Sequence, residues 1–530
     1  MHIEHLSEAL GIEVPMVVPI ILIVYMAVML ALGFYAAKKV KNSEDWFVGS
    51  RKMGPWITSL AHGSSSLGGG MYIAGPQFGW EMGAAALWAA PGDVFGPLLN
   101  FGIIARRMRR FTERVKSFTI PDFFAYRYYS NNVRLIAVII LVVAMVISMV
   151  VEYLAMGVIV SAITGWSFFA SLLIGCVVVL LYTGAGGYLA VAYTDFAQSI
   201  LMIIGLLILI PVCIASVGGF SGMNWGLYQI DPGLPTLWGP GFELYGAPLM
   251  IAGIACVYFI GYMGQPHLII KTVAVKDTAS IRMVPMIGAV FGFILAFGVY
   301  TLGCVGRVIF PDIAMLPNQN PEYIMPMLTL KLLPPVLAGL LLAGAAAAIM
   351  STASALLLVI GSSVGNDLYK NLINKNASEK QVMNVTRMAT YGLGLLGIAL
   401  CFVPLLQVGI YQVTWIAWSV LSPAFIPPIL AGLFWRRATK EGALASMISG
   451  SITGFAWYYL LQTSTNIHTF FAALVISTIS MIVVSLMTKK PPRDVIEVMD
   501  EAAALDDPSE PVAAGVAMSR IRFNQLLAAV

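Results

Sequence analysis

Long stretches of apolar residues with few or no charges dominate this sequence. Residues 16–37, 136–160, 196–217 and 284–306 have the length of about 20 residues with which an α-helix crosses the hydrocarbon core of a bilayer. Of the 530 residues, 59% are hydrophobic and only 11% are charged, whereas an ordinary soluble domain is roughly 25% charged. Most of the chain cannot face water, and we expect an all-α membrane protein.

Polar or turn-rich breaks separate the apolar runs and predict about thirteen transmembrane helices. The first residues carry glutamates and no basic cluster, so they do not resemble a cleavable signal peptide, and the first helix is expected to be retained. An odd number of spans places the two ends of the chain on opposite sides of the membrane. The predicted spans lie near residues 16–37, 55–78, 83–105, 133–162, 166–188, 195–217, 247–269, 284–308, 334–365, 386–405, 411–434, 441–461 and 469–488.

The distribution of Lys and Arg predicts the orientation, because cytoplasmic loops are enriched in these residues. Alternate connections are basic, and one of them contains Lys271, Lys276 and Arg282. The connection 218–246 has neither Lys nor Arg but carries Trp and Tyr, as expected of a loop at the outer interface. We therefore expect the N-terminus outside and the C-terminus in the cytoplasm, in the cell's inner (plasma) membrane.

No linker rich in Pro, Gly or Ser divides the chain. Residues 1–490 are expected to form one transmembrane domain with a core at about 55–434. Residues 491–530 mix acidic residues, Pro and Ala, and are interpreted as a cytoplasmic tail that is disordered or weakly helical.

Two of the predicted spans carry residues that interrupt a helix. Residues 62–70 contain four Gly and three Ser, and each Gly disfavours a helix by about 1 kcal/mol relative to Ala. In residues 261–267, Pro266 removes a backbone donor and clashes with the preceding turn. Interrupted helices offer carbonyls and half-helix ends to ions and solutes at mid-membrane depth. Close packing of a Gly-rich helix against a neighbour is the alternative for the first break.

The spacing of the two breaks predicts the arrangement of the helices. The breaks are five helices apart, as expected if two inverted repeats of five helices follow one extra helix and precede two more.

Polar residues within the predicted spans also indicate a functional site, since ionisable side chains are costly in lipid. Asp93, Glu152 and Asp195 are the acidic cases, and the alternative for Asp195 is a helix cap at the inner interface. In the ninth span, Ser351 and Ser354 share a helix face. Hydroxyl and carbonyl oxygens suit a hard cation such as sodium, although Ser and Thr in membrane helices also bond back to the preceding turn.

The sequence lacks the patterns of several other protein classes. The five cysteines form no CxxC pair, which argues against a zinc site and a disulfide framework. No HExxH motif, nucleophile elbow or pair of catalytic carboxylates is present, so neither an enzyme nor an organic cofactor is expected. The expected partners are a small-molecule solute and membrane lipid, without nucleic acid or an obligatory protein partner.

Several motifs, taken together and in order, resemble those of the sodium:solute symporter family. The likeness runs from about residue 16 to 488, and Gly264–His267 is similar to the helix break of the sodium/proline branch. The resemblance implies a LeuT-like inverted-repeat core and sodium-driven alternating access. The other motifs are Thr119–Phe124, Gly186–Val191 with Tyr193–Asp195 and Gln198, and Ala348–Thr352 with Asp367–Lys370.

The resemblance also implies the residues that bind the coupling ion, Na+, the one metal expected. The main sodium site would use three backbone carbonyls and two hydroxyls, those of Ser64, Leu67 and Ala348 and those of Ser351 and Thr352.

A second sodium site, present in some members, would use Asp195, Ser351 and Ser354. Ala355 stands where those members have another Ser, which leaves the number of ions open. Ser66 takes the place of an Asp of the sodium/proline branch.

The solute is expected between the two breaks. Tyr258 and Tyr262 are four residues apart and share one helix face, and resemblance to the proline branch implies that Tyr153 and Tyr262 line the pocket. The full set of expected solute-binding residues is Ser66, Gly68, Gly69, Gly70, Glu152, Tyr153, Tyr258, Tyr262 and Gln265.

Two resemblances favour different solutes. Residues 302–312 and 331–335 resemble the sodium/pantothenate branch and favour a carboxylate or an amino acid, such as proline, pantothenate or a short monocarboxylate. The setting of Glu152 resembles the choline branch, and a buried carboxylate near aromatic rings favours a cationic or amine-bearing solute. The longer matches support the first class. An uncoupled channel or uniporter is the alternative of another class.

Overall fold

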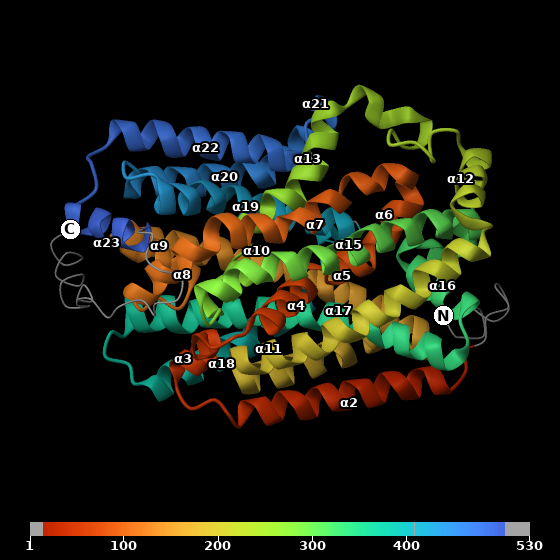
Figure 1. The fold of residues 1–530 in the computed structure, drawn as a ribbon, viewed down its shortest axis with the longest axis horizontal. Helices are drawn as coiled ribbons and strands as arrows, with labels where there is room; N and C mark the ends of the chain where they lie inside the picture. The colour runs from red at the N-terminus through yellow and green to blue at the C-terminus, as the bar shows by residue number, and fades with distance from the viewer. Residues whose placement is uncertain (1–13, 407–408, 504–530) are drawn as a thin grey trace.

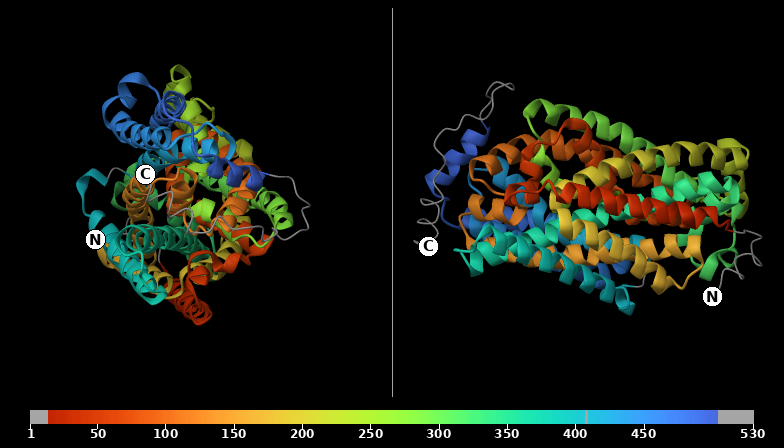
Figure 2. Two further views of the ribbon diagram at one scale, coloured as in Figure 1. Left: turned by 90° about the vertical axis from the view of Figure 1, so that its left-hand side faces the viewer. Right: turned by 90° about the horizontal axis from the view of Figure 1, so that it is seen from below.

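A computed structural model of the protein describes residues 14–406 and 409–503. In these residues the chain is helical, with one isolated β-bridge between Met53 and Val275 and no β-strand. Most helices run along the long axis of the molecule (Figure 1), and the end-on view shows them packed as a bundle (Figure 2). Helix α2 begins at one end of this axis and α23 lies at the other.

The elements before the connection at 218–246 follow the predicted spans closely. Capping residues set both ends of helix α10. The Ser130 side chain accepts from the Val133 N–H at its start, and Gly165, at φ 65°, ends it. The elements are α2 (Val17–Ala37), α3 (Ser43–Val48), η1 (Gly49–Arg51), α4 (Pro55–Ser66), α5 (Gly69–Tyr72), α6 (Ala74–Met82), η2 (Gly83–Trp88), α7 (Ala90–Leu99), η3 (Asn100–Ile104), α8 (Ala105–Arg114), α9 (Ile120–Arg127), α10 (Asn131–Thr164) and α11 (Phe168–Ser216).

The remaining elements include several short helices in the connections. They are α12 (Gly219–Ile230), η4 (Pro240–Gly246), α13 (Pro248–Phe259), η5 (Gly261–Gly264), α14 (Pro266–Ala274), α15 (Thr278–Ile309), η6 (Ile313–Met315), η7 (Pro317–Gln319), η8 (Pro321–Tyr323), α16 (Ile324–Leu332), α17 (Pro335–Ser362), η9 (Ser363–Ile373), α18 (Glu379–Leu400), η10 (Pro404–Leu406), α19 (Ile410–Phe434), α20 (Lys440–Leu460), α21 (Gln462–Thr465), α22 (Thr469–Met487) and α23 (Arg493–Ala503).

The predicted number of spans is not confirmed. Seven described helices are long and apolar enough to cross a membrane, or up to eight if the bent pair Pro240–Gly246 and Pro248–Phe259 forms one span. Two effects lower the number. Interrupted spans divide into short helices, and the spans predicted at 166–188 and 195–217 both lie in α11, which bends at Gly187 with φ 54° and ψ −146°.

Two regions contain more helix than the sequence analysis predicted. The connection at 218–246, which was predicted to lie outside, includes helix α12. Part of the predicted tail forms α23, which buries Val495, Val498 and Met499 and packs against α8. Arg114 of α8 pairs with Glu501 at 2.5 Å. Residues 504–530 of the predicted tail, and the N-terminal residues 1–13, lie outside the described part of the chain.

Helix α17 occupies the centre of the bundle. Every residue in the most apolar stretch of this helix is buried. In the corresponding stretch of α2, at the edge of the bundle, only 33% of the residues are buried. Its sequence is rich in Ala and Gly, and small residues let neighbouring backbones approach closely in a membrane bundle. Its hydroxyls therefore face other protein segments rather than lipid.

Candidate functional site

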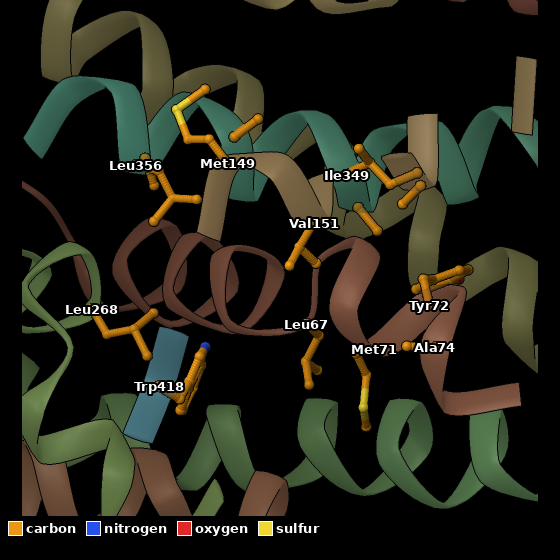
Figure 3. Close-up of a cluster of buried hydrophobic side chains, with 14 of the residues drawn as sticks. Leu67, Met71, Tyr72, Ala74, Met149, Val151, Leu268, Ile349, Leu356 and Trp418 are labelled. Carbon is orange, nitrogen blue, oxygen red and sulfur yellow. The ribbon is translucent and has the colours of Figure 1, made fainter. Parts of the chain in front are cut away.

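The structure confirms the predicted break in the second span. Helix α4 ends at Ser66, Leu67 and Gly68 leave the helical conformation, and α5 resumes at Gly69. Leu67 and Met71 project to the same side of the chain at this interruption (Figure 3). The Leu67 N–H still donates to the Gly63 carbonyl, and the Gly68 carbonyl accepts the first backbone bonds of α5, from Met71 and Tyr72.

Close approach explains the glycines at this break. A Cβ on Gly69 would lie 2.5 Å from the Ala155 Cβ and 2.9 Å from Glu152 Oε2. A Cβ on Gly68 would collide with the Thr352 hydroxyl. Without side chains here, the Gly69 N–H reaches Glu152 Oε2 at 2.7 Å. The glycines therefore bring the broken helix against both α10 and α17.

The second predicted break is also confirmed. Helix α13 gives way to the short η5, Gln265 is extended, and α14 begins at Pro266. The Gln265 side chain donates to Ser422 Oγ at 2.8 Å, and Ser422 Oγ donates to the Gly261 carbonyl at 2.8 Å. Helix α19 thereby supports both sides of the interruption.

Hydroxyls of α17 meet the first break. Ser351 Oγ lies 2.9 Å from the carbonyl oxygen of Ser64 and 2.8 Å from that of Ala348, within hydrogen-bond reach of both. Thr352 Oγ1 lies 3.3 Å from the Ser64 carbonyl and 3.2 Å from that of Ser65. All of these groups are buried. The structure thus brings four residues of the predicted main sodium site into contact, and Leu67, the fifth, lies at the adjoining break.

Asp195 has a partner that the sequence analysis did not foresee. Lys271 was expected in a basic cytoplasmic connection, but its side chain is 2% exposed and its Nζ lies 2.8 Å from Asp195 Oδ2. Ser65 Oγ donates to the same carboxylate oxygen at 2.9 Å. Of the other residues predicted for the second sodium site, Ser354 donates its hydroxyl to the Ser351 carbonyl at 3.0 Å.

A small cavity lies beside the first break. The space open to the centre of a water molecule is about 30 Å³, enough for only a few waters. Of the predicted solute-binding residues, Ser66, Gly68, Gly70, Glu152 and Tyr258 line it. The other lining residues are Ser65, Met71, Asp93, Ser148, Val151, His267, Thr352, Leu356, Thr414 and Trp418.

The structure places the other predicted solute-binding residues outside the lining. Tyr153 packs against α18, where a Cβ on Gly397 would lie 3.0 Å from the Tyr153 ring. Tyr262 lies behind the cavity and donates its hydroxyl to Asp93 Oδ1 at 3.0 Å. Gln265 donates its side-chain N–H to Ser422 of α19. Gly69 does not line the cavity, but its N–H donates to Glu152, which does.

Sequence reasoning missed several of the lining residues. Asp93 was noted as a buried acid but not assigned to the site, and His267 belongs to a motif that was noted for its proline. Thr414 and Trp418 were not considered. They are four residues apart in α19 and so share a helix face. This spacing was the sequence feature that could have identified them.

Comparisons with known proteins agree with one another. The sequence profile of the sodium:solute symporter family matches residues 46–450. The osmoregulated proline transporter of Bacillus subtilis is 31% identical over 88% of this chain and 94% of its own length. The sodium/proline symporter of Escherichia coli is 31% identical over 91% of this chain and 95% of its own.

Solved structures share the fold. A Na+-coupled sialic acid symporter in a substrate-bound outward-open state superposes with a TM-score of 0.75 at 18% identity, covering 90% of this chain and 99% of that one. Mhp1, a nucleobase-cation-symport-1 family transporter, gives a TM-score of 0.53 at 13% identity over 87% of this chain and 99% of that one. The likeness to these two transporters shows the fold that they share with this chain.

The family profile covers most of the chain, and the relatives are transporters of nearly the same length. Their activities and the apolar helices identify this chain as a multi-pass membrane transporter rather than an enzyme. The protein belongs to the sodium:solute symporter family.

Proposed function

We propose that the protein carries a small zwitterionic solute, an amino or imino acid such as proline, into the cell together with sodium by alternating access. The observation that carries the proposal is the position of Thr352, whose hydroxyl contacts the Ser64 carbonyl at 3.3 Å and also lines the cavity. An ion held by these oxygens would border the solute, so each would affect binding of the other.

The ion site is made of neutral oxygens. The hydroxyls of Ser351 and Thr352 each have lone pairs that can face a cation, and both now donate to carbonyls of the broken helix or of α17 itself. Sodium would replace these hydrogen bonds with contacts to the same oxygens. The ligands we propose are the carbonyls of Ser64, Leu67 and Ala348 and the hydroxyls of Ser351 and Thr352.

The charges around the cavity favour a solute with an ammonium group. Asp93 and Glu152 line the described cavity, whereas its lining includes neither Lys nor Arg. The rings of Tyr258 and Trp418, whose centroids are 5.6 Å apart, offer faces to a hydrocarbon ring or a cation. Hydrogen-bond donors for a solute carboxylate are available from Thr352, Thr414 and His267, and the sodium ion would offset its negative charge.

The relatives support the amino or imino acid. The two bacterial proteins compared above are described as proline transporters. Pantothenate and short monocarboxylates bring a carboxylate without an ammonium group, and they would leave Asp93 and Glu152 without a cationic partner.

A quaternary amine such as choline is the second candidate. The same two acids and the aromatic rings would attract its charge, but it lacks a carboxylate to accept from the donors that line the cavity. Binding of choline in preference to proline would favour this candidate.

A thermal-shift screen of the purified protein tests the proposal, because a ligand stabilises the native state that binds it. We would compare proline, pantothenate, short monocarboxylates and choline, with and without sodium. The expected result is stabilisation by proline only when sodium is present, followed by sodium-driven accumulation of proline in proteoliposomes. Uptake that is unchanged when potassium replaces sodium would indicate an uncoupled channel or uniporter and overturn the proposal.

A further inference from the structure

We infer that the Lys271 ammonium acts as a built-in cation at the second cation site of this transporter, so that the chain binds a single sodium ion. The inference rests on the proposed sodium coupling and specifies its stoichiometry. It concerns the site that the sequence analysis assigned to Asp195, Ser351 and Ser354.

Three oxygens surround the ammonium. Lys271 Nζ donates to the Ala61 carbonyl at 2.5 Å, to Ser65 Oγ at 2.5 Å and to Asp195 Oδ2 at 2.8 Å. A lysine ammonium has three donors and no acceptor, so these partners use all of its hydrogen-bonding capacity. One carbonyl, one hydroxyl and one carboxylate are also ligand types that a hard metal cation prefers.

The same atoms connect this position to the main ion site. Ser65 follows Ser64 in the broken helix, and Ser65 Oγ contacts the Ser351 carbonyl at 3.3 Å. That carbonyl also accepts from Ser354 Oγ at 3.0 Å. The predicted ligands of a second sodium are therefore already gathered near Lys271 and Asp195.

Charge balance explains why a second sodium would be excluded. The side chain of Asp195 is 0% exposed and that of Lys271 is 2% exposed, and their opposite charges offset one another. An additional sodium at the same oxygens would lie next to the Lys271 ammonium, and the repulsion between two adjacent like charges in a buried site is costly. At the main site, by contrast, the oxygens are neutral and no lysine occupies them.

Removal of the lysine charge should restore the second ion. In Lys271→Met a neutral side chain of similar reach replaces lysine, and the buried Asp195 then lacks a cation. A purely structural ion pair would lose stability in this variant but gain no ion. In Lys271→Met/Asp195→Asn both charges are absent, and no second ion is needed. Lys271→Arg is the matched control that keeps the positive charge.

The experiment counts bound radioactive sodium on purified full-length protein without added solute. We expect one ion on the wild type, twice as much on Lys271→Met, and the wild-type amount on Lys271→Arg and on the double variant. Two ions on the wild type would overturn the inference even if Lys271→Met does not fold. So would an unchanged amount on folded Lys271→Met. Wild-type protein that binds no sodium would instead remove the proposed sodium coupling.

Discussion

The Ser351 hydroxyl donates to the Ser64 carbonyl at 2.9 Å and joins helices whose contacting residues are 287 positions apart in the sequence. Ser64 lies in the last turn of α4 before the break, and Ser351 lies in the buried central helix α17. The contact fixes the distance between the two segments from which the proposed sodium ligands come.

Loss of either hydroxyl should weaken sodium binding. Removing one partner of a buried polar contact costs about 1–3 kcal/mol, so Ser351→Ala and Thr352→Ala are each expected to raise the sodium concentration for half-maximal uptake about tenfold or more. Ser362→Ala is the control, because Ser362 lies in the same helix but lines a different cavity. Unchanged sodium dependence in both Ser351→Ala and Thr352→Ala would exclude the proposed ion site.

A methyl group at Gly69 should abolish transport. The added Cβ would lie 2.5 Å from that of Ala155, and the broken helix would have to move away from α10 and lose its contact with Glu152. Gly102→Ala is the matched control, since a Cβ there meets no described atom within 4 Å. The measurement is solute uptake normalised to the amount of protein in the membrane. Normal uptake by Gly69→Ala would show that the tight approach is not required.

Neutralisation of Glu152 should weaken binding of the solute more than that of sodium. Gln in this position keeps an oxygen for the Gly69 N–H but loses the charge that would attract an ammonium group. Hydrogen bonds to charged groups contribute about 1.5–3 kcal/mol, so we expect KM for proline to rise at least tenfold. Glu441→Gln, in the first turn of α20, is the control. A wild-type KM in Glu152→Gln would argue against an ammonium contact there.

Tyr153 and Tyr258 should differ in their effect on solute binding. Tyr258 lines the cavity, whereas Tyr153 packs against α18. Tyr258→Ala should therefore raise KM for the solute. Tyr153→Phe should leave KM nearly unchanged, because it removes only a buried hydroxyl that makes no hydrogen bond in the described part of the chain. Kinetics of uptake at saturating sodium separate the two. A large KM change in Tyr153→Phe would support the contact implied by the family resemblance.

Local sequence chemistry was sufficient to predict both helix breaks. The Gly-rich run before Gly69 and the proline at 266 act on their own backbone, so their effect is independent of distant partners. The predicted spans were also close to the observed helices. Their number was harder to establish, because α11 contains two predicted spans that meet at a non-helical bend at Gly187.

Contacts between distant segments were the part that the sequence did not reveal. Lys271 stands near the end of a predicted span, where the charge rule assigns lysine to a cytoplasmic loop, and only its pairing with Asp195 explains its burial. Glu152 and Tyr153 were both assigned to the solute, yet adjacent residues of a helix point about 100° apart. The resemblance supplied both positions without deciding which of them faces the cavity.

Helix α23 has a practical consequence for protein engineering. It covers part of α8 with apolar side chains and is held by the pairs Arg114–Glu501 and Arg436–Asp500. An affinity tag or fluorescent reporter fused directly after residue 490 would take the place of α23. The part of α8 that α23 covers would then be exposed and would promote aggregation. Purification handles should therefore follow Ala503, where the packed helix remains intact.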